Sequence, residues 1–230
     1  MNKIISISVW GSSPQYCIGA IKNAEIAKKL LPDWKCRVFV NDSVPVDYQK
    51  RLYDMDNVEV AEIDSDGTYG MFWRFYSMFE SEDNISISRD SDSRITEREV
   101  RCLNEWLESD KKFSIIRDHV RHYDWPMMGG MWGMKGTLDD SVYNLMEKYS
   151  KQHQYAIDQV FLKDVVWMLA KEDCIIGSIP IGYADGLPYF KKPITVSVNG
   201  KEFKTAGKLN MDLTLINFEQ DSSIKIGDTV

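Results

Sequence analysis

Short apolar runs alternate with longer segments of helical periodicity from the N-terminus to about residue 172. The short runs are bounded by Gly, Pro, Asn or Asp, as strands are. The longer segments space their apolar residues three and four positions apart, which is typical of one helical face. Strands that alternate with helices predict a mostly parallel sheet with helices on both faces. We therefore expect an α/β domain over residues 1–173, with strands at residues 3–10, 36–40, 58–63, 85–88 and 113–116.

Composition narrows the class of protein. The chain has 230 residues, of which 43% are hydrophobic and seven are Trp, enough for one medium domain and an appendage. The net charge of −7, with no basic stripe, argues against nucleic-acid binding. The four cysteines are scattered and show no metal-binding spacing, which favours reduced thiols and a cytoplasmic location. No apolar run has membrane-spanning length, so we expect no transmembrane segment.

An acidic pair follows the predicted strand Ile85–Ser88. Asp90 and Asp92 lie one residue apart between Arg89 and Arg94. The carboxyl ends of strands in α/β sheets are where ligands bind, and carboxylate oxygens suit Mg or Mn. Two further Asp-x-Asp pairs occur in turns of this acidic chain, and a capped loop with surface ion pairs explains the spacing equally well.

Local signals predict where several other elements begin and end. Thr96 and Glu99 form a capping-box pattern at the start of a helix. The glycine-rich residues 129–136 are expected to form a loop, and Thr137 to cap the helix that follows. A last helix is expected over residues 155–170.

Further polar and aromatic residues lie near the predicted strand ends. Arg74 interrupts a predicted aromatic helix. Its guanidinium is suited to bind a diphosphate. The alternative is that the side chain extends to solvent. Asp118 and His119 follow a strand. Gly130 allows close backbone approach, and Trp132 offers an indole for stacking on a sugar; the alternative is a structural turn with a core Trp.

The residues discussed above belong to short stretches that, taken in order along the chain, resemble a bacterial family of glycosyltransferase-like proteins associated with surface and capsular polysaccharides. The resemblance covers residues 1 to about 172 and implies a GT-A type fold, a nucleotide-sugar donor and a glycan acceptor. It also implies that Asp90 and Asp92 hold Mn or Mg, which neutralises the leaving diphosphate. The matching stretches are Phe72–Phe75, Ser88–Arg94, Glu105–Leu107, Ile116–His119, Gly129–Gly133, Asp158–Gln159 and Phe161–Leu162.

The resemblance assigns roles to individual residues. The residues expected to bind the donor or substrate are Arg74, Arg89, Arg94, Gly130 and Trp132. The candidate catalytic residues are Asp118, His119 and Asp158. For Asp158 the alternative is helix capping.

Beyond Asp173 the pattern becomes all-β. Asn199-Gly200 is a two-residue hairpin signal between alternating strands. Residues 177–230 resemble part of the C-terminal β-domain of alanine racemases, which implies a small partial barrel. Tyr183 and Met211 match residues near the substrate in that family; alternatively they are ordinary strand residues. The matching stretches are Ile179–Gly186, Val198–Gly200, Gly207, Met211–Asp212, Gly227–Asp228 and Val230.

The racemase reaction itself is not expected from this sequence. An enzyme that uses pyridoxal phosphate (PLP) in this way needs a lysine that bonds the cofactor. In alanine racemases that lysine lies in an N-terminal (β/α)₈ barrel, and the tyrosine base lies upstream of the tail, so PLP is not expected to bind. The main hypothesis is a metal-dependent glycosyltransferase with a racemase-type tail. The alternatives are a catalytically incomplete racemase-related protein, with PLP elsewhere or on a partner chain, and an inactive fusion whose tail strands self-associate.

Overall fold

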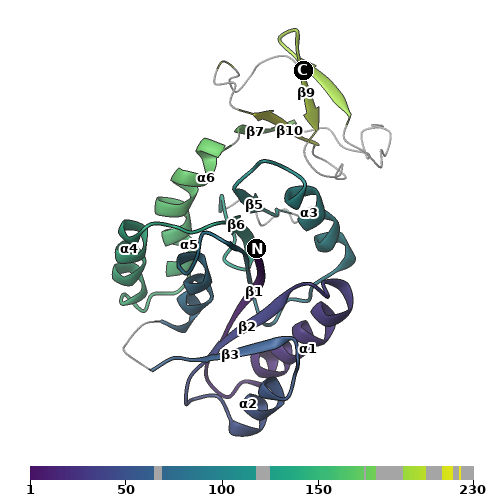
Figure 1. The fold of residues 1–230 in the computed structure, drawn as a ribbon. Helices are drawn as coiled ribbons and strands as arrows, with labels where there is room; N and C mark the ends of the chain where they lie inside the picture. Colours follow the sequence, from purple (N-terminus) through teal and green to yellow (C-terminus); the bar gives the residue numbers. More distant parts are fainter. Residues whose placement is uncertain are drawn as a thin grey trace. The chain divides into compact units, whose positions relative to one another are not determined.

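The computed structural model describes residues 1–64, 69–117, 125–173, 175–179, 194–205, 214–219 and 223. The chain divides into two compact units, Met1–Met168 and Leu169–Val230 (Figure 1). The first unit contains a six-stranded sheet with helices, and the second a four-stranded antiparallel sheet. The prediction of an α/β sheet followed by an all-β segment is therefore confirmed.

The first sheet is mixed. Its order is β3-β2-β1-β4-β6-β5, and the pairs β1–β2, β2–β3 and β1–β4 are parallel. Strand β6 pairs antiparallel with both β4 and β5. The strands are β1 (Asn2–Val9), β2 (Lys35–Val40), β3 (Val58–Glu62), β4 (Asn84–Arg89), β5 (Phe113–Ile115) and β6 (Met131–Lys135).

Both faces of this sheet are covered. On one face Ile5, Ile7 and Val38 pack with Ala20 and Ala24 of α1 in the main core cluster. On the other face lies the 3₁₀ helix η1, where Ser77 Oγ donates to Ser6 Oγ at 3.1 Å. The helical elements are α1 (Pro14–Leu30), α2 (Val46–Tyr53), η1 (Gly70–Phe79), α3 (Glu97–Leu107), α4 (Asp140–Ser150), α5 (Ile157–Phe161), the π segment η3 (Leu162–Val166) and α6 (Trp167–Asp173).

The glycine-rich segment 129–136 was wrongly expected to be a loop. Its residues Met131–Lys135 form β6, which lies between β4 and the edge strand β5. A Cβ on Gly133 would lie 2.6 Å from Ile87 Cγ2 and 2.8 Å from Ser86 O on β4. This glycine therefore permits close approach of two strands, which local patterning does not distinguish from a loop.

Two further expectations about helices need correction. The N-cap of α4 is Asp139, which accepts a hydrogen bond from Ser141 N at 2.8 Å, whereas Thr137 Oγ1 donates to Met78 O at 3.2 Å. The single helix expected over residues 155–170 is α5, η3 and α6, interrupted by the π turn.

Helix α3 begins where its capping signal predicts, but only half of the capping box forms. Thr96 Oγ1 accepts a hydrogen bond from Glu99 N at 3.3 Å. The Glu99 carboxylate does not complete the box, because it binds Arg89 Nη1 at 2.6 Å instead. The residue at the third helical position thus joins α3 to the end of β4.

We expect Thr96→Ala to lower the free energy of unfolding by about 1 kcal/mol, the usual contribution of a hydroxyl N-cap. Urea unfolding followed by Trp fluorescence would measure this, since all seven Trp lie in the first unit. Thr96→Ser keeps the acceptor and should lose much less. Equal losses for the two variants would contradict a capping role.

The second sheet has the order β7-β10-β9-β8. Its strands are β7 (Ile175–Ile179), β8 (Thr195–Val198), β9 (Lys201–Thr205) and β10 (Thr214–Glu219). Asn199 and Gly200 have φ of 50° and 78°, as the predicted two-residue hairpin turn requires. Phe203 and Phe218 pack edge to face with ring centroids 4.9 Å apart.

In the part of the chain that the structure describes, none of the helices combines the length and the apolar character needed to cross a membrane.

Candidate functional site

The loop after β4 is held by a side chain from α1. Asn23 is fully buried, and its Nδ2 lies 3.3 Å from Asp90 O, 3.1 Å from Ser91 O and 2.8 Å from Ser93 O. Its Oδ1 accepts a hydrogen bond from Ile95 N at 3.1 Å. One amide thus binds four backbone groups and fixes the loop that carries the acidic pair.

Asp90 is the exposed end of a partly buried charge cluster that we call the Asp-Arg-Asp triad (Asp90, Arg74 and Asp158). Arg74 Nη1 forms an ion pair with Asp90 Oδ1, and Arg74 Nη2 lies 2.7 Å from Asp158 Oδ2. Arg74 is 7% exposed and Asp158 is 4% exposed. Burial alone would lower the pKa of Arg74, but attraction to the two carboxylates outweighs it and raises the pKa above its ordinary value.

The triad joins parts of the chain that are distant in sequence. Arg74 comes from η1, Asp90 follows β4, and Asp158 belongs to α5. The Arg74 guanidinium also lies 5.4 Å from the ring centroid of Phe75. In this structure Arg74 already neutralises Asp90, the first of the two carboxylates expected to hold a metal.

Asp92, the second of that pair, has a different environment. It lies in an exposed position, where its Oδ2 accepts a hydrogen bond from Gln15 Nε2 at 3.0 Å. In the described part of the chain, no three His, Cys, Asp or Glu side chains are grouped so as to hold a metal ion. The expectation of Mn or Mg therefore receives no support from the described residues.

Arg89 and Arg94, expected to meet a donor, bind the protein itself. Arg89 is 2% exposed, and its Nη2 donates to Arg94 O at 2.6 Å in addition to the Nη1 bond with Glu99. Arg94 Nη1 donates to Ser91 O at 2.9 Å. These bonds hold the loop after β4 against the start of α3, while Arg89 Nε is buried without a hydrogen-bond partner.

Two further sequence-predicted residues, Gly130 and Trp132, are packed inside the first unit. Gly130 lies against Asp90, since a Cβ there would be 2.6 Å from Asp90 N. Trp132 is 2% exposed, and its ring centroid lies 5.6 Å from that of Phe75. The indole therefore has no open face on which a ligand could stack.

Four predicted site residues lie outside the described part of the chain. These are Asp118, His119, Tyr183 and Met211. Their proposed roles stay predictions.

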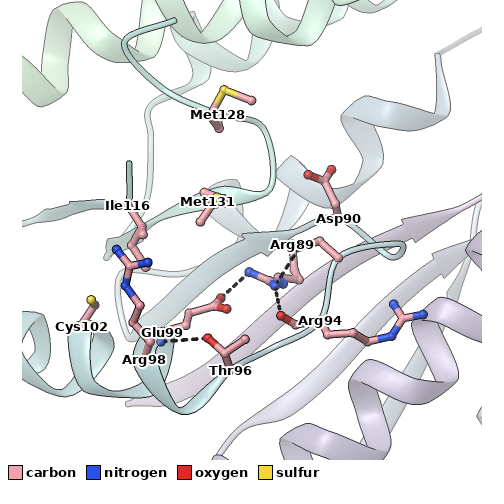
Figure 2. Close-up of a pocket in the computed structure, with 11 residues that line it drawn as sticks. Arg89, Asp90, Arg94, Thr96, Arg98, Glu99, Cys102, Ile116, Met128 and Met131 are labelled. Carbon is pink, nitrogen blue, oxygen red and sulfur yellow. Dashed lines mark hydrogen bonds and ion pairs between the residues drawn. The ribbon is translucent and has the colours of Figure 1, made fainter. Parts of the chain in front are cut away.

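A pocket of about 270 Å³ opens beside the loop (Figure 2). It is bounded by the end of β4, the first turns of α3, and residues at the ends of β5 and β6. The lining residues are Arg89, Asp90, Ser93, Arg94, Thr96, Arg98, Glu99, Cys102, Ile116, Met128 and Met131. Of the residues predicted to form a site, Arg89, Asp90 and Arg94 therefore share this pocket.

Sequence reasoning missed the structural role of Asn23. The sequence does contain a signal for this role. Asn23 is a polar residue on the face of α1 that also contains Ala20, Ala24 and Ala27 and is otherwise apolar. A buried amide in that position must find hydrogen-bond partners. The sequence does not show which backbone groups those partners are.

Comparison with known proteins identifies a relationship for the C-terminal part of the chain. The family model "Alanine racemase, C-terminal domain" matches residues 166–230. The alanine racemase of Staphylococcus saprophyticus is 46% identical over 61 residues, which cover 26% of this chain and 15% of the relative. That of Shewanella sp. strain W3-18-1 is 25% identical over 164 residues, covering 64% of this chain and 46% of the relative. The C-terminal part of the chain is therefore similar to alanine racemases, and the chain spans less than half the length of these relatives.

A solved alanine racemase from Clostridium difficile 630 also aligns with the chain. The alignment covers 96% of this chain and 59% of that one, at 13% identity and a TM-score of 0.24. This score is too low to define a shared fold.

The comparisons overturn the glycosyltransferase assignment. The family model and the curated relatives reported above are alanine racemases, and the Shewanella alignment is longer than the second unit, so it extends into the first. The short motifs that suggested a glycosyltransferase have structural explanations here. Asp90 is paired with Arg74, Gly130 makes room for Asp90, and Arg89 binds Glu99. Short polar motifs at strand ends were therefore insufficient to identify the class of protein.

Proposed function

We propose that the C-terminal segment acts as an alanine-racemase-type module that completes a racemase active site. The match of residues 166–230 to the C-terminal domain of alanine racemases carries this proposal. The 46% identity to the Staphylococcus saprophyticus enzyme lies within the range where related domains keep their residue positions. Tyr183 and Met211 are the residues proposed to lie near the substrate, alanine.

The proposal requires PLP, a cofactor that needs a suitable lysine in its site. PLP supplies the electron sink for reactions at the α-carbon of an amino acid and is held through a lysine. In the described part of the chain no lysine is buried. Lys135, which is partly buried, donates to Ser109 O at 2.6 Å and Trp106 O at 3.0 Å. The described residues therefore do not fit PLP, and we propose that the cofactor lysine belongs to another chain.

Complementation would test this proposal. The Staphylococcus saprophyticus racemase would be shortened to remove its C-terminal domain, loaded with PLP and mixed with the 230-residue chain. We expect the mixture to convert L-alanine to D-alanine, while each protein alone does not. Bound PLP, measured by absorbance after gel filtration, should remain with the shortened racemase.

Variants of two tyrosines provide the matched control. Tyr183→Phe should abolish the restored activity, whereas Tyr155→Phe, which changes a tyrosine 92% exposed and outside the matched segment, should leave it intact. The isolated C-terminal domain of the Staphylococcus enzyme serves as positive control. If that domain restores activity and the full chain does not, the proposed function is wrong.

A further inference from the structure

Polar side chains meet on one face of the first sheet, where β1 and β4 end. Ser6 of β1 faces η1, since its Oγ accepts a hydrogen bond from Ser77 Oγ at 3.1 Å. Side chains alternate along a strand, so Ser8 faces η1 as well. Ser6 is paired with Ser88 in the register of the two parallel strands, which places Ser8 beside Asp90 where the pairing ends. The carboxyl ends of strands in such sheets are where ligands bind.

The Asp-Arg-Asp triad contains more negative than positive charge. Arg74 faces both Asp90 and Asp158, and among the described residues neither carboxylate has a second ion-pair partner. The side chain of Asp90 is 40% exposed, whereas that of Asp158 is 6% exposed. In Figure 2 the Asp90 carboxylate points away from Arg89 and Arg94. The unbalanced negative charge of the triad is therefore accessible at Asp90.

The hydroxyl beside Asp90 is buried without a hydrogen-bond partner. Ser8 is 5% exposed, and its Oγ bonds no group in the part of the chain that the structure describes. Buried polar atoms nearly always have a partner, so an unpaired one calls for an explanation. A ligand that donates a hydrogen bond at this point would supply the missing partner.

An exposed indole borders the same face. Trp10 directly follows β1 and is 37% exposed. Its ring packs edge to face on Tyr69 and Trp73, with centroids 6.1 and 6.2 Å apart. Trp73 precedes Arg74 in η1, so the indole and the triad rest on neighbouring residues of one helix. An aromatic ring close to an unbalanced carboxylate suits an organic cation.

We propose that the carboxyl ends of β1 and β4 bind a small organic ammonium ion on the side of the sheet that faces η1. The ammonium N–H groups donate to the Asp90 carboxylate and to Ser8 Oγ, and the carbon body of the ligand packs on Trp10. An anion would instead meet the unbalanced negative charge of the triad. The proposal concerns the first unit alone and does not depend on the racemase-type function of the C-terminal segment.

Calorimetric titration of the 230-residue chain with four probes would test this site. Benzylammonium carries both the charge and an apolar body, benzyl alcohol the body without charge, and ammonium chloride the charge without the body. Magnesium chloride supplies a cation that has neither the body nor N–H donors. We expect benzylammonium to bind about tenfold more tightly than each of the other three. No heat from benzylammonium at millimolar concentration, or equal binding of any other probe, would overturn the proposal.

Two aspartate variants with the same change of charge make the test specific. Asp90→Asn should weaken benzylammonium binding about tenfold, the lower end of what a hydrogen bond to a charged group contributes. Asp92→Asn removes the exposed carboxylate that bonds Gln15 of α1, and should change the affinity by no more than about twofold. Equal losses in the two variants would mean that the cation senses only the overall charge, and would overturn the proposed site.

Two further variants test the hydroxyl and the indole without removing a charge. Ser8→Ala deletes a hydroxyl that has no partner in the described structure, so urea unfolding should show no loss of stability. Binding of benzylammonium should nevertheless weaken roughly threefold, near the lower end of what a hydrogen bond contributes. Trp10→Leu should weaken it by about the same factor, as expected for an exposed cation–π contact. Unchanged affinity in either variant would overturn the proposal.

Discussion

Arg74→Met is expected to lower the free energy of unfolding by about 3–5 kcal/mol, because it leaves Asp158 buried without its cation. Asp158 is 4% exposed and makes its ion pair with Arg74 at 2.7 Å. Asp90, whose side chain is 40% exposed, can turn to solvent and contributes less to this loss. The measurement is urea unfolding followed by Trp fluorescence, which reports on the first unit.

A second variant separates the loss of the cation from the loss of packing. The double variant Arg74→Met with Asp158→Leu removes both buried charges, and we expect it to recover at least half of the lost stability. Arg101→Met, on the exposed face of α3, is the control for the substitution itself. An exposed ion pair contributes at most about 1 kcal/mol, so a loss below that value for Arg74→Met would contradict a buried ion pair between Arg74 and Asp158.

Asn23→Ala is expected to lower the free energy of unfolding by about 3 kcal/mol, because several buried backbone groups lose their partner at once. The Asn23 amide contacts the carbonyl oxygens of Asp90, Ser91 and Ser93 and the N–H of Ile95. Release of the loop should also speed trypsin cleavage after Arg94. Unfolding in urea and the rate of that cleavage are the two measurements.

The control is Asn104→Ala, which removes an exposed asparagine from α3. It should change neither stability nor cleavage after Arg94. Should Asn23→Ala behave like Asn104→Ala in both assays, Asn23 would not hold the loop.

These two clusters bear on function as well as stability. Both involve Asp90, and Arg89 is bound separately by Glu99, so contacts within the first unit remove the need for a metal or a sugar nucleotide to explain Asp90 and Arg89. The relationship to alanine racemases comes instead from the segment 166–230, whose candidate residues Tyr183 and Met211 lie outside the described part of the chain.

The periodicity of the sequence determined most of the secondary structure. The alternation of apolar runs and helical segments predicted β1 to β5, the Thr96/Glu99 pattern predicted the start of α3, and Asn199-Gly200 predicted the hairpin of β8 and β9. These signals are local, since a strand end, a capping residue or a turn depends on neighbours within a few positions. Strand β6 was missed because its glycine, Gly133, is explained only by contact with β4.

The sequence by itself also determined the relationship of residues 166–230 to alanine racemases, because identity along a segment needs no knowledge of contacts. Only the tertiary structure decided what the polar residues of the first unit do. Arg74 and Asp158 are 84 positions apart, and Asn23 is 67–72 positions from the loop that it holds. No local pattern encodes such pairs, since they form only when the sheet brings the ends of its strands and helices together. The same acidic pair that suggested a metal site in the sequence is, in the folded chain, divided between a buried arginine and the protein surface.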